Sequence, residues 1–245
     1  QRMIPNILSI AGSDPSGGAG IQADIKTISA LGGYAMAAIT ALTAQNTMGV
    51  TGVHVPPASF IAAQIDAIFN DIEVHAVKIG MLANAEIVAA VADRLRFHSA
   101  RNIVLDPVLV ATSGDSLGDP DVVDAIKTQL FPLAALATPN LPEAVRLSGL
   151  DEDASLEELA RAIGDSGCRA VLVKGGHMEG GTADDLLFDG TAARIFSAVR
   201  VDTNNTHGTG CTLSSAIATH LAKKHELVDA ITAAKAYLSA ALEAS

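Results

Sequence analysis

The chain has 245 residues, and its 27 acidic residues outnumber its 16 lysines and arginines, which gives a formal net charge of −11 at pH 7. So acidic a chain has no general basic surface for the phosphates of a nucleic acid, and any anion must bind at a small local site. Hydrophobic residues make up 49% of the chain and charged residues 18%, which excludes an intrinsically disordered protein.

Short apolar runs alternate with amphipathic segments along the whole chain. In chain order, the predicted strands are Ile7–Ile10, Ala35–Leu42, Ala76–Ile79, Asn102–Leu105, Ala135–Thr138 and Ala170–Val173. The predicted helices are Ile21–Leu31, Ser59–Phe69, Ala85–Phe97, Pro120–Leu130, Ser155–Ile163, Thr209–Leu221 and Leu227–Leu242. Asp184–Phe188 and Ala193–Phe196 predict an antiparallel hairpin that turns at Asp189-Gly190. This alternation is typical of an α/β domain with a mostly parallel sheet covered by helices on both faces.

No linker, low-complexity stretch or internal repeat divides the chain, so we expect residues 1–245 to form one domain. Its two cysteines, Cys168 and Cys211, provide neither a disulfide framework nor a metal cluster. No apolar run approaches the roughly 20 residues that cross a membrane. A reducing, cytoplasmic setting is therefore the expectation.

Several predicted strands lead directly into glycine-rich or polar segments. In parallel sheets, ligands bind beyond the carboxyl ends of the strands, so we expect these segments to meet at one edge of the sheet. The segments are Gly12–Gly20, Asp106-Pro107, Asn140–Glu143 and Lys174–Gly176.

The segment Gly12–Gly20 places four glycines between a strand and a helix. Glycine permits a close approach of the backbone to a ligand, and a simple turn would need only one or two. We favour a ligand-binding loop over a tight turn. The spacing fits neither the dinucleotide-binding fingerprint nor the P-loop.

A second glycine-containing segment, Gly208-Thr209-Gly210, opens a predicted helix. Successive backbone N–H groups at a helix start form an anion site that needs no net positive charge. The same field is expected to lower the pKa of Cys211 and favour its thiolate. A buried cysteine in a first helical turn is an equally good interpretation of this motif alone.

Four polar residues near the other strand ends have both a functional and an ordinary interpretation. Asn140 and Glu143 could hold a hydrated divalent cation, although helix capping explains the same spacing more simply. Lys174 could bind a phosphate or extend along the surface. Asp106 could be an active-site acid or merely end a strand. His177 and His207 lie near these segments and are weak candidates.

Together these segments resemble the hydroxymethylpyrimidine kinase/phosphomethylpyrimidine kinase family of thiamine biosynthesis. The resemblance covers nearly the whole chain in order. It rests on residues 11–24 (AGSDPSGGAGIQAD), 39–47 (ITALTAQNT), 78–82 (KIGML), 106–108 (DPV), 138–143 (TPNLPE), 174–177 (KGGH) and 205–214 (NTHGTGCTLS). It implies a ribokinase-like fold, a three-layer α/β/α arrangement, and a homodimer.

The resemblance also implies a reaction, in which ATP with Mg²⁺ phosphorylates 4-amino-5-hydroxymethyl-2-methylpyrimidine and then its monophosphate. The implied pyrimidine-binding residues are Gln45, Asp24, Gly12, Ala19, Met81 and Val108. The implied ATP-binding residues are Asn140, Glu143, Lys174 and Thr206, and the implied metal-binding residues are Asp106 and Glu143, partly through water. The implied catalytic residues are Cys211, Lys174 and the anion hole Gly208, Thr209 and Gly210.

Cys211 distinguishes this chain from most ribokinase-like enzymes, which usually carry an aspartate at the corresponding position. We hypothesise that a thiol tolerates two different acceptors: as a thiolate it would take a hydroxymethyl proton, and as a thiol it would not repel an acceptor phosphate. Cys211 could instead only position the acceptor. Two departures from the family are Leu109, where methionine is frequent, and the end of the chain at Ser245, ahead of the family's usual tail.

Three other functions remain possible at the level of sequence. A vitamin B6 kinase is close, because hydroxymethyl groups on pyridine and pyrimidine rings are chemically similar. A non-catalytic protein that binds a pyrimidine or pyridoxal phosphate could use the same scaffold. A cysteine-dependent hydrolase is the third, although the sequence offers Cys211 no persuasive His/Asp partner pattern.

Overall fold

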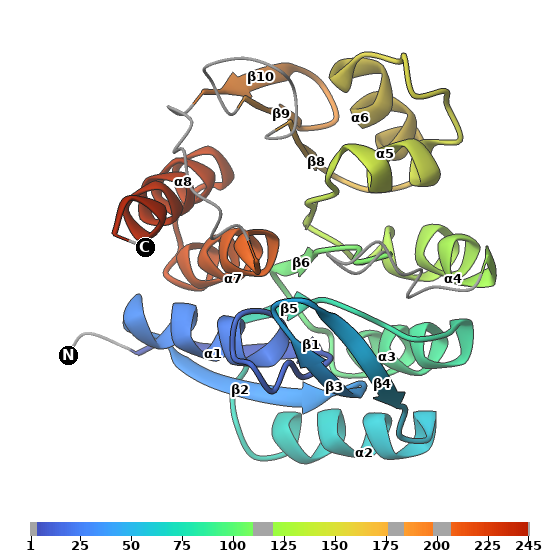
Figure 1. Cartoon of the computed structure of the whole chain (residues 1–245), viewed down its shortest axis with the longest axis vertical. Coiled ribbons are helices and arrows are strands. Elements are labelled where there is room, and N and C mark those ends of the chain that lie inside the picture. Colours follow the sequence, from blue (N-terminus) through green and yellow to red (C-terminus); the bar gives the residue numbers. More distant parts are fainter. Residues whose placement is uncertain (1–3, 110–119, 176–183, 198–206, 245) are drawn as a thin grey trace.

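The structure is a computed structural model, and it describes residues 4–109, 120–175, 184–197 and 207–244. Its main sheet has eight strands in the order β10-β9-β8-β7-β6-β5-β1-β2 (Figure 1). The six from β8 to β2 are parallel, and β9 and β10 are antiparallel to their neighbours. The bounds are β1 Asn6–Ala11, β2 Tyr34–Ile39, β5 Ala76–Ile79, β6 Ile103–Leu105, β7 Leu136–Ala137, β8 Val171–Lys174, β9 Asp185–Phe188 and β10 Ala193–Phe196.

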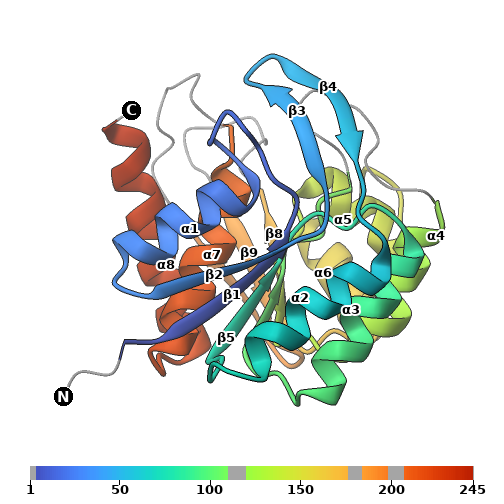
Figure 2. The same ribbon diagram turned by 90° about the horizontal axis from the view of Figure 1, so that it is seen from below.

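Helices cover both faces of this sheet, which confirms the predicted three-layer α/β/α arrangement (Figure 2). One face carries α1 (Gly20–Ala30), α7 (Thr209–Ala222) and α8 (Leu227–Glu243). The other face carries α2 (Ala58–Phe69), α3 (Ala85–Phe97), α4 (Pro120–Ala125) with the π-helical turn η1 (Ile126–Leu130), α5 (Leu141–Ser148) and α6 (Leu156–Asp165). Of these helices, none is long and apolar enough to cross a membrane in the described part of the chain.

The central strands form where consecutive residues are apolar, since helices bury both faces of the sheet there. All four residues of β5 are buried, although one of them is Lys78. Backbone bonds continue the sheet one residue beyond several strands: Asp106 N–H donates to the carbonyl of Ile79, and Thr138 N–H to that of Leu105. The polar residues that follow the strands are thereby held at one common edge.

Helices α3, α5 and α6 each begin at a polar residue whose side chain caps the first turn. Asn84 accepts the N–H of Ile87 at the start of α3. Ser155 and Glu158 form a capping box at α6. Such caps satisfy N–H groups that have no partner within the helix. Gly149 ends α5 with a φ of 73°, a conformation that glycine adopts easily.

One predicted strand, Ala35–Leu42, is wrong in its extent. The chain turns at Thr40, whose N–H donates to Ala11 and whose Oγ1 donates to the carbonyl of Met81 at 2.6 Å. After this turn the chain forms a separate two-stranded sheet, β3 (Leu42–Asn46) and β4 (Gly49–His54), which projects beyond the main sheet (Figure 2). Neither the two strands of this small sheet nor the extent of α5 was predicted, whereas the hairpin of β9 and β10 was.

Candidate phosphoryl-transfer site

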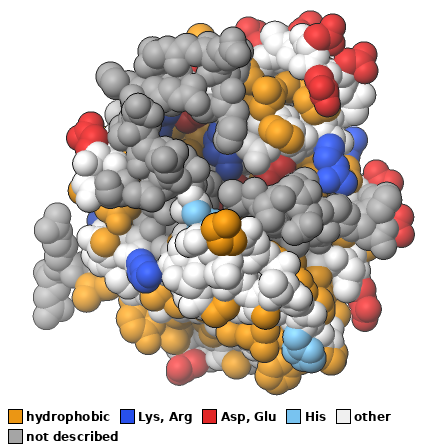
Figure 3. Space-filling model, in the orientation of Figure 1, with side chains coloured by type: hydrophobic (Ala, Val, Ile, Leu, Met, Phe, Trp, Pro, Cys, Tyr) orange, Lys and Arg blue, Asp and Glu red, His pale blue; other side chains and the backbone are white. Residues whose placement is uncertain are grey.

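Lys174 and Asp106 form an ion pair at the carboxyl edge of the main sheet. Lys174 Nζ lies 3.0 Å from Asp106 Oδ1. A Cβ atom placed on Gly210, in the first turn of α7, would lie 3.0 Å from the same Nζ and 3.6 Å from Asp106 Oδ2. Three segments far apart in the sequence therefore meet here, as the strand ends predicted. In Figure 3, basic and acidic side chains lie next to each other in a recess of this face.

The two charges hold each other in the ionised form. Burial alone would raise the pKa of Asp106, but Lys174 and Lys78 outweigh it and hold this pKa below its usual range. Burial likewise opposes the charge of Lys174, yet Asp106 and Glu143 raise its pKa above normal. The site thus offers a fixed ammonium group at neutral pH.

Asn140 and Glu143 form the capping box of α5, so the ordinary interpretation of their spacing is correct. The N–H of Asn140 donates to Glu143 Oε2, and the N–H of Glu143 donates to Asn140 Oδ1, both at 2.9 Å. The backbones of Asn140 and Lys174 also form an isolated parallel β-bridge, which places the cap of α5 beside the Lys174–Asp106 ion pair. Burial raises the pKa of Glu143 to about 7, and the neighbouring charge of Asp106 adds to this rise, while Lys174 opposes it.

The start of α7 is the predicted anion site. Gly208 is the N-cap, with a φ of 78°, and the helix runs for 14 residues from Thr209. In any α-helix the first N–H groups have no partner inside the helix, and the positive end of the dipole adds to their attraction for an anion. Lys174 Nζ lies beside this helix end, so the partial positive charge of the helix N-terminus and the ammonium charge lie next to each other.

The expected lowering of the Cys211 pKa is wrong. Burial raises the pKa of this thiol to about 11, and the nearby carboxylates of Asp24 and Asp106 add to the rise. Lys78 and a hydrogen bond from the Gly20 backbone oppose it but do not overcome it. With a pKa this far above neutral, Cys211 is a neutral thiol at pH 7, because burial and the two carboxylates outweigh Lys78.

The other predicted loop, Gly12–Gly20, folds back on itself beside β3. A Cβ atom on Gly12 would lie 3.1 Å from Met81 Sδ, so these two predicted pyrimidine-binding residues are neighbours. Thr43 Oγ1 bonds the carbonyl of Ser13 at 2.7 Å and lies 3.1 Å from Gln45 Oε1. Gln45, half-buried on β3, is thereby linked to this loop.

Asp24 does not take the predicted role of a substrate contact. Its side chain is fully buried and paired with Lys78 Nζ at 2.9 Å. Ser9 and Ser215 donate to its two carboxylate oxygens, each at 2.6 Å. With all these partners inside the protein, Asp24 has no side-chain surface left for a ligand.

Lys78 is the charged residue that the sequence analysis missed, although it lies within the motif at residues 78–82. Its side chain is fully buried, and its pKa is raised by Asp24 despite burial, which acts in the opposite direction. The available signal was a lysine inside a four-residue strand that is otherwise apolar. A buried lysine requires a buried partner.

The remaining predicted residues are placed as follows. Ala19 lies in the glycine-rich loop, where its N–H donates to Asp14 Oδ2 at 2.9 Å. Val108 is half-buried beside Asp106, whose carbonyl accepts its N–H. Thr206 and His177 lie outside the described residues. His207 is described and contacts Asp14, with Nε2 2.9 Å from Oδ2.

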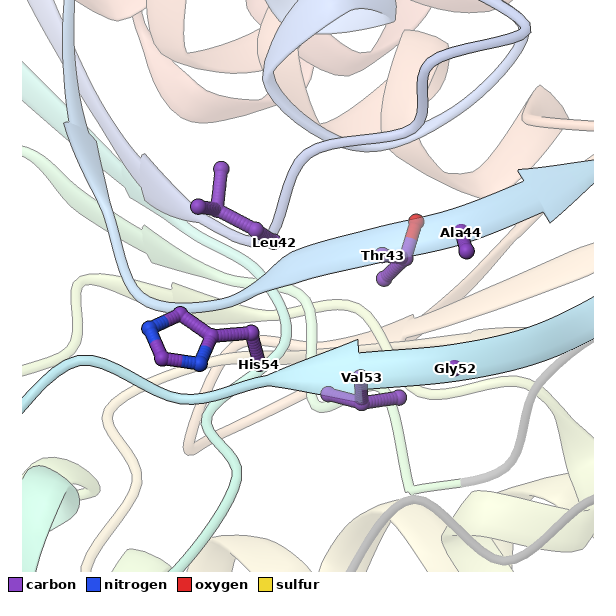
Figure 4. A pocket seen from close by; sticks show the side chains of 6 residues that line it. All are labelled: Leu42, Thr43, Ala44, Gly52, Val53 and His54. Carbon is purple, nitrogen blue, oxygen red and sulfur yellow. The ribbon is translucent and has the colours of Figure 1, made fainter.

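A shallow depression lies apart from the ion pair, on the two-stranded sheet (Figure 4). Its lining side chains come from both strands: Leu42, Thr43, Ala44, Gly52, Val53 and His54. Its lining carries no charged cluster, and Thr43 connects it to the glycine-rich loop through the carbonyl of Ser13.

Comparison with known proteins identifies the family. A family model described as phosphomethylpyrimidine kinase matches residues 14–245. The hydroxymethylpyrimidine/phosphomethylpyrimidine kinase of Rhizobium meliloti is 54% identical over 241 residues, covering 97% of this chain and 90% of that protein. This chain belongs to the phosphomethylpyrimidine kinase family. The protein of the same name from Salmonella typhimurium is 50% identical over 240 residues, with the same coverage of each chain.

Solved structures show that the fold is shared across this family and the related pyridoxal kinases. Phosphomethylpyrimidine kinase from Clostridium difficile has a TM-score of 0.85 and 40% identity, covering 97% of this chain and 99% of that one. A Bacillus subtilis pyridoxal kinase in complex with ADP has a TM-score of 0.87 and 38% identity, covering 95% and 89%. The ribokinase-like fold expected from the sequence is therefore correct.

Proposed function

We propose that this chain transfers the γ-phosphoryl group of ATP to 4-amino-5-hydroxymethyl-2-methylpyrimidine and then to the resulting monophosphate, as an enzyme of thiamine biosynthesis. The observation that carries the proposal is the Lys174–Asp106 ion pair beside the first turn of α7, in a member of this family. Phosphoryl transfer depends on positioning and charge neutralisation more than on covalent chemistry. The names of the relatives support both acceptors.

The phosphates of ATP would lie against α7. The N–H groups of Gly208, Thr209 and Gly210 would bind the transferred phosphoryl group, and Lys174 would neutralise its charge. Asn140 and Glu143 would contact the nucleotide from the neighbouring strand end. Thr206 stays a predicted ATP-binding residue outside the described part of the chain.

Asp106 and Glu143 fit a Mg²⁺ ion, which we propose they hold partly through water. Their mutual repulsion contributes to the raised pKa of Glu143, and a divalent cation near both would remove it. No cluster of three or more His, Cys, Asp or Glu side chains that could hold a metal exists in the described ranges. Few protein ligands plus phosphates and water are typical of Mg²⁺, which would reduce repulsion between the phosphates.

The acceptor pyrimidine would lie between the glycine-rich loop and β3. Gln45 suits an aminopyrimidine edge because its amide both donates and accepts hydrogen bonds. Gly12, Ala19, Met81 and Val108 would form the remaining walls. Asp24 is excluded from this set and would act only through its pairing with Lys78.

Cys211 would meet the acceptor as a neutral thiol. A thiol does not repel the phosphate of the second acceptor, whereas an aspartate would. Cys211→Asp should therefore reduce the second phosphorylation far more than the first, and Cys211→Ser, which stays neutral, should spare the ratio of the two. Normal diphosphate formation by Cys211→Asp would contradict this role.

The decisive assay incubates the protein with ATP, Mg²⁺ and the hydroxymethylpyrimidine and separates the mono- and diphosphate products. We expect both products, in that order, and their loss when Mg²⁺ is chelated. Failure to consume ATP while the pyrimidine binds tightly would instead favour a non-catalytic binding protein.

A pyridoxal kinase is the second candidate. The Staphylococcus aureus pyridoxal kinase in complex with AMP-PCP and pyridoxal has a TM-score of 0.88 and 33% identity, covering 97% of this chain and 87% of that one. Turnover of pyridoxal measured beside that of the pyrimidine separates the two functions. A kcat/KM that is higher for pyridoxal would overturn the first choice.

Three broader expectations accompany this proposal. We propose that residues 1–245 act as one catalytic unit, that the enzyme is a homodimer, and that it works in the cytoplasm. The first rests on the eight-stranded sheet, whose strand ends hold Asp106, Asn140 and Lys174 together. The other two rest on the family resemblance and on the reduced cysteines.

A further inference from the structure

The glycine-rich loop, residues 12–20, meets the start of α7 at three points. His207 Nε2 lies 2.9 Å from Asp14 Oδ2. A Cβ atom on Gly208 would collide with the carbonyl oxygen of Gly18, so the two backbones are in direct contact. The backbone of Gly20 lies close enough to the thiol of Cys211 to lower its pKa. These contacts join segments that are separated by almost the whole chain.

Asp14 is the fixed half of the His207 contact. Its side chain is buried and accepts the N–H of Ser16 at 2.9 Å, the hydroxyl of Ser16 at 2.7 Å and the N–H of Ala19 at 2.9 Å. Gln22 in turn accepts the N–H of Asp14 at 2.8 Å. The loop is therefore folded by its own hydrogen bonds, and removal of the His207 side chain leaves all of them in place.

His207 is the other half of this contact, and it directly precedes the N-cap of α7. Its ring also packs against Gly18, where a Cβ atom would collide with ring carbon Cδ2. Any shift of His207 relative to Asp14 consequently shifts the N–H groups that follow it. The contact controls where the anion site stands relative to the glycine-rich loop.

In the proposed reaction, the glycine-rich loop belongs to the acceptor site and the start of α7 belongs to the phosphoryl site. The glycine-rich loop holds Gly12 beside Met81 and connects through Ser13 and Thr43 to Gln45, on the acceptor side. The start of α7 holds Gly210 against Lys174, on the phosphoryl side. A displacement of about 1 Å between reacting groups can cost on the order of 100-fold in rate.

We infer that His207 is a positioning residue, whose contact with Asp14 fixes the acceptor pocket against the phosphoryl site. This inference rests on the proposed kinase function. It requires no contact between His207 and either substrate. The effect of its loss should appear in the rate of transfer and not in the binding of ATP or acceptor.

The kinetic test compares His207→Ala with His207→Gln, whose side-chain amide keeps a donor near the position of Nε2. His225→Ala, an exposed histidine after α7, is the control. We expect kcat to fall about 10- to 100-fold in His207→Ala, with both KM values within about threefold, and to return to within about fivefold in His207→Gln. An increased KM at unchanged kcat would mean that His207 binds a substrate, and equal losses in both variants would mean a merely structural role.

A second measurement does not depend on activity. The rate of Cys211 alkylation by iodoacetamide is followed in the ligand-free protein, because the Gly20 contact with Cys211 loosens when the two segments separate. Alkylation should accelerate in His207→Ala and stay near the wild-type rate in His207→Gln and His225→Ala. An unchanged rate in His207→Ala overturns the inference, whereas an inactive wild-type enzyme with the expected alkylation pattern overturns only the proposed function.

Discussion

Two buried ion pairs, built from the same two residue types, lie on either side of the first turns of α7. Lys78 and Asp24 are 2.9 Å apart, and both side chains are fully buried. Lys174 and Asp106 are 3.0 Å apart, with 15% and 3% of their side chains exposed. The distances are nearly equal, so the difference between the pairs lies in their surroundings.

In the fully buried Lys78–Asp24 pair, the enclosed pair, Asp24 accepts short hydrogen bonds from Ser9 and Ser215, each at 2.6 Å. In the partly exposed Lys174–Asp106 pair, the open pair, the hydrogen bonds to the carboxylate are longer: Thr138 and Ser214 lie 3.3 Å from the Asp106 oxygens. A carboxylate whose bonds are short and complete is part of the core. A cation that keeps an exposed side can bind a ligand, and the difference therefore separates a stabilising pair from a functional one.

Lys78→Met should produce the largest effect, a loss of roughly 3–5 kcal/mol in the free energy of unfolding, because it leaves the Asp24 charge buried without its partner. Urea denaturation measures this loss. The double variant Lys78→Met with Asp24→Asn should be more stable than Lys78→Met alone, since no unpaired charge remains. If Lys78→Met is as stable as the wild type, the enclosed pair is not a structural element.

Lys174→Met should reduce kcat about 100- to 1000-fold, or roughly 3–4 kcal/mol of transition-state stabilisation, because the phosphoryl group loses its charge partner. Its stability should change less than that of Lys78→Met, since the buried Asp106 keeps the nearby positive charge of Lys78. Steady-state kinetics and urea denaturation are measured on the same preparation. A large stability loss with normal kcat would reverse the assignment of the two pairs.

The smallest expected effect is on the reactivity of the Cys211 thiol, whose pKa responds to Lys78, Asp24 and Asp106 from the two ion pairs. Because its pKa is raised from 9.0 to about 11, its alkylation at neutral pH should be about 100-fold slower than that of an ordinary thiol. The rate should keep rising as pH increases toward 11, since the reactive thiolate accumulates only there. A plateau below pH 8 would show that the helix field prevails over burial.

Much of the sheet and of the phosphoryl side could be predicted because the signals are local. The apolar run of β5 predicts a buried strand, and sheet geometry places Asp106, directly after β6, and Lys174, at the end of β8, at the same edge. The partner of Lys78 could not be predicted, since Asp24 lies 54 positions earlier, on a helix. The pKa of Cys211 was misjudged for the same reason: it depends on burial and on carboxylates from other elements.

The break between β2 and β3 is another case where tertiary contacts prevail over local preference. Residues 35–42 are apolar enough to continue as one strand, yet the Thr40 hydroxyl finds the carbonyl of Met81. A bond between residues 41 positions apart leaves no trace in the local pattern. The resulting turn creates β3 and moves Gln45 away from the main sheet.

Adjacent residues of α7 contact the two carboxylates: Ser214 lies against Asp106, and Ser215 against Asp24. A helix held at two neighbouring positions by two different partners can neither slide along the sheet nor turn about its own axis without breaking one contact. α7 is therefore a fixed reference within the molecule. We therefore expect any closure around a nucleotide to come from the segments that surround this helix.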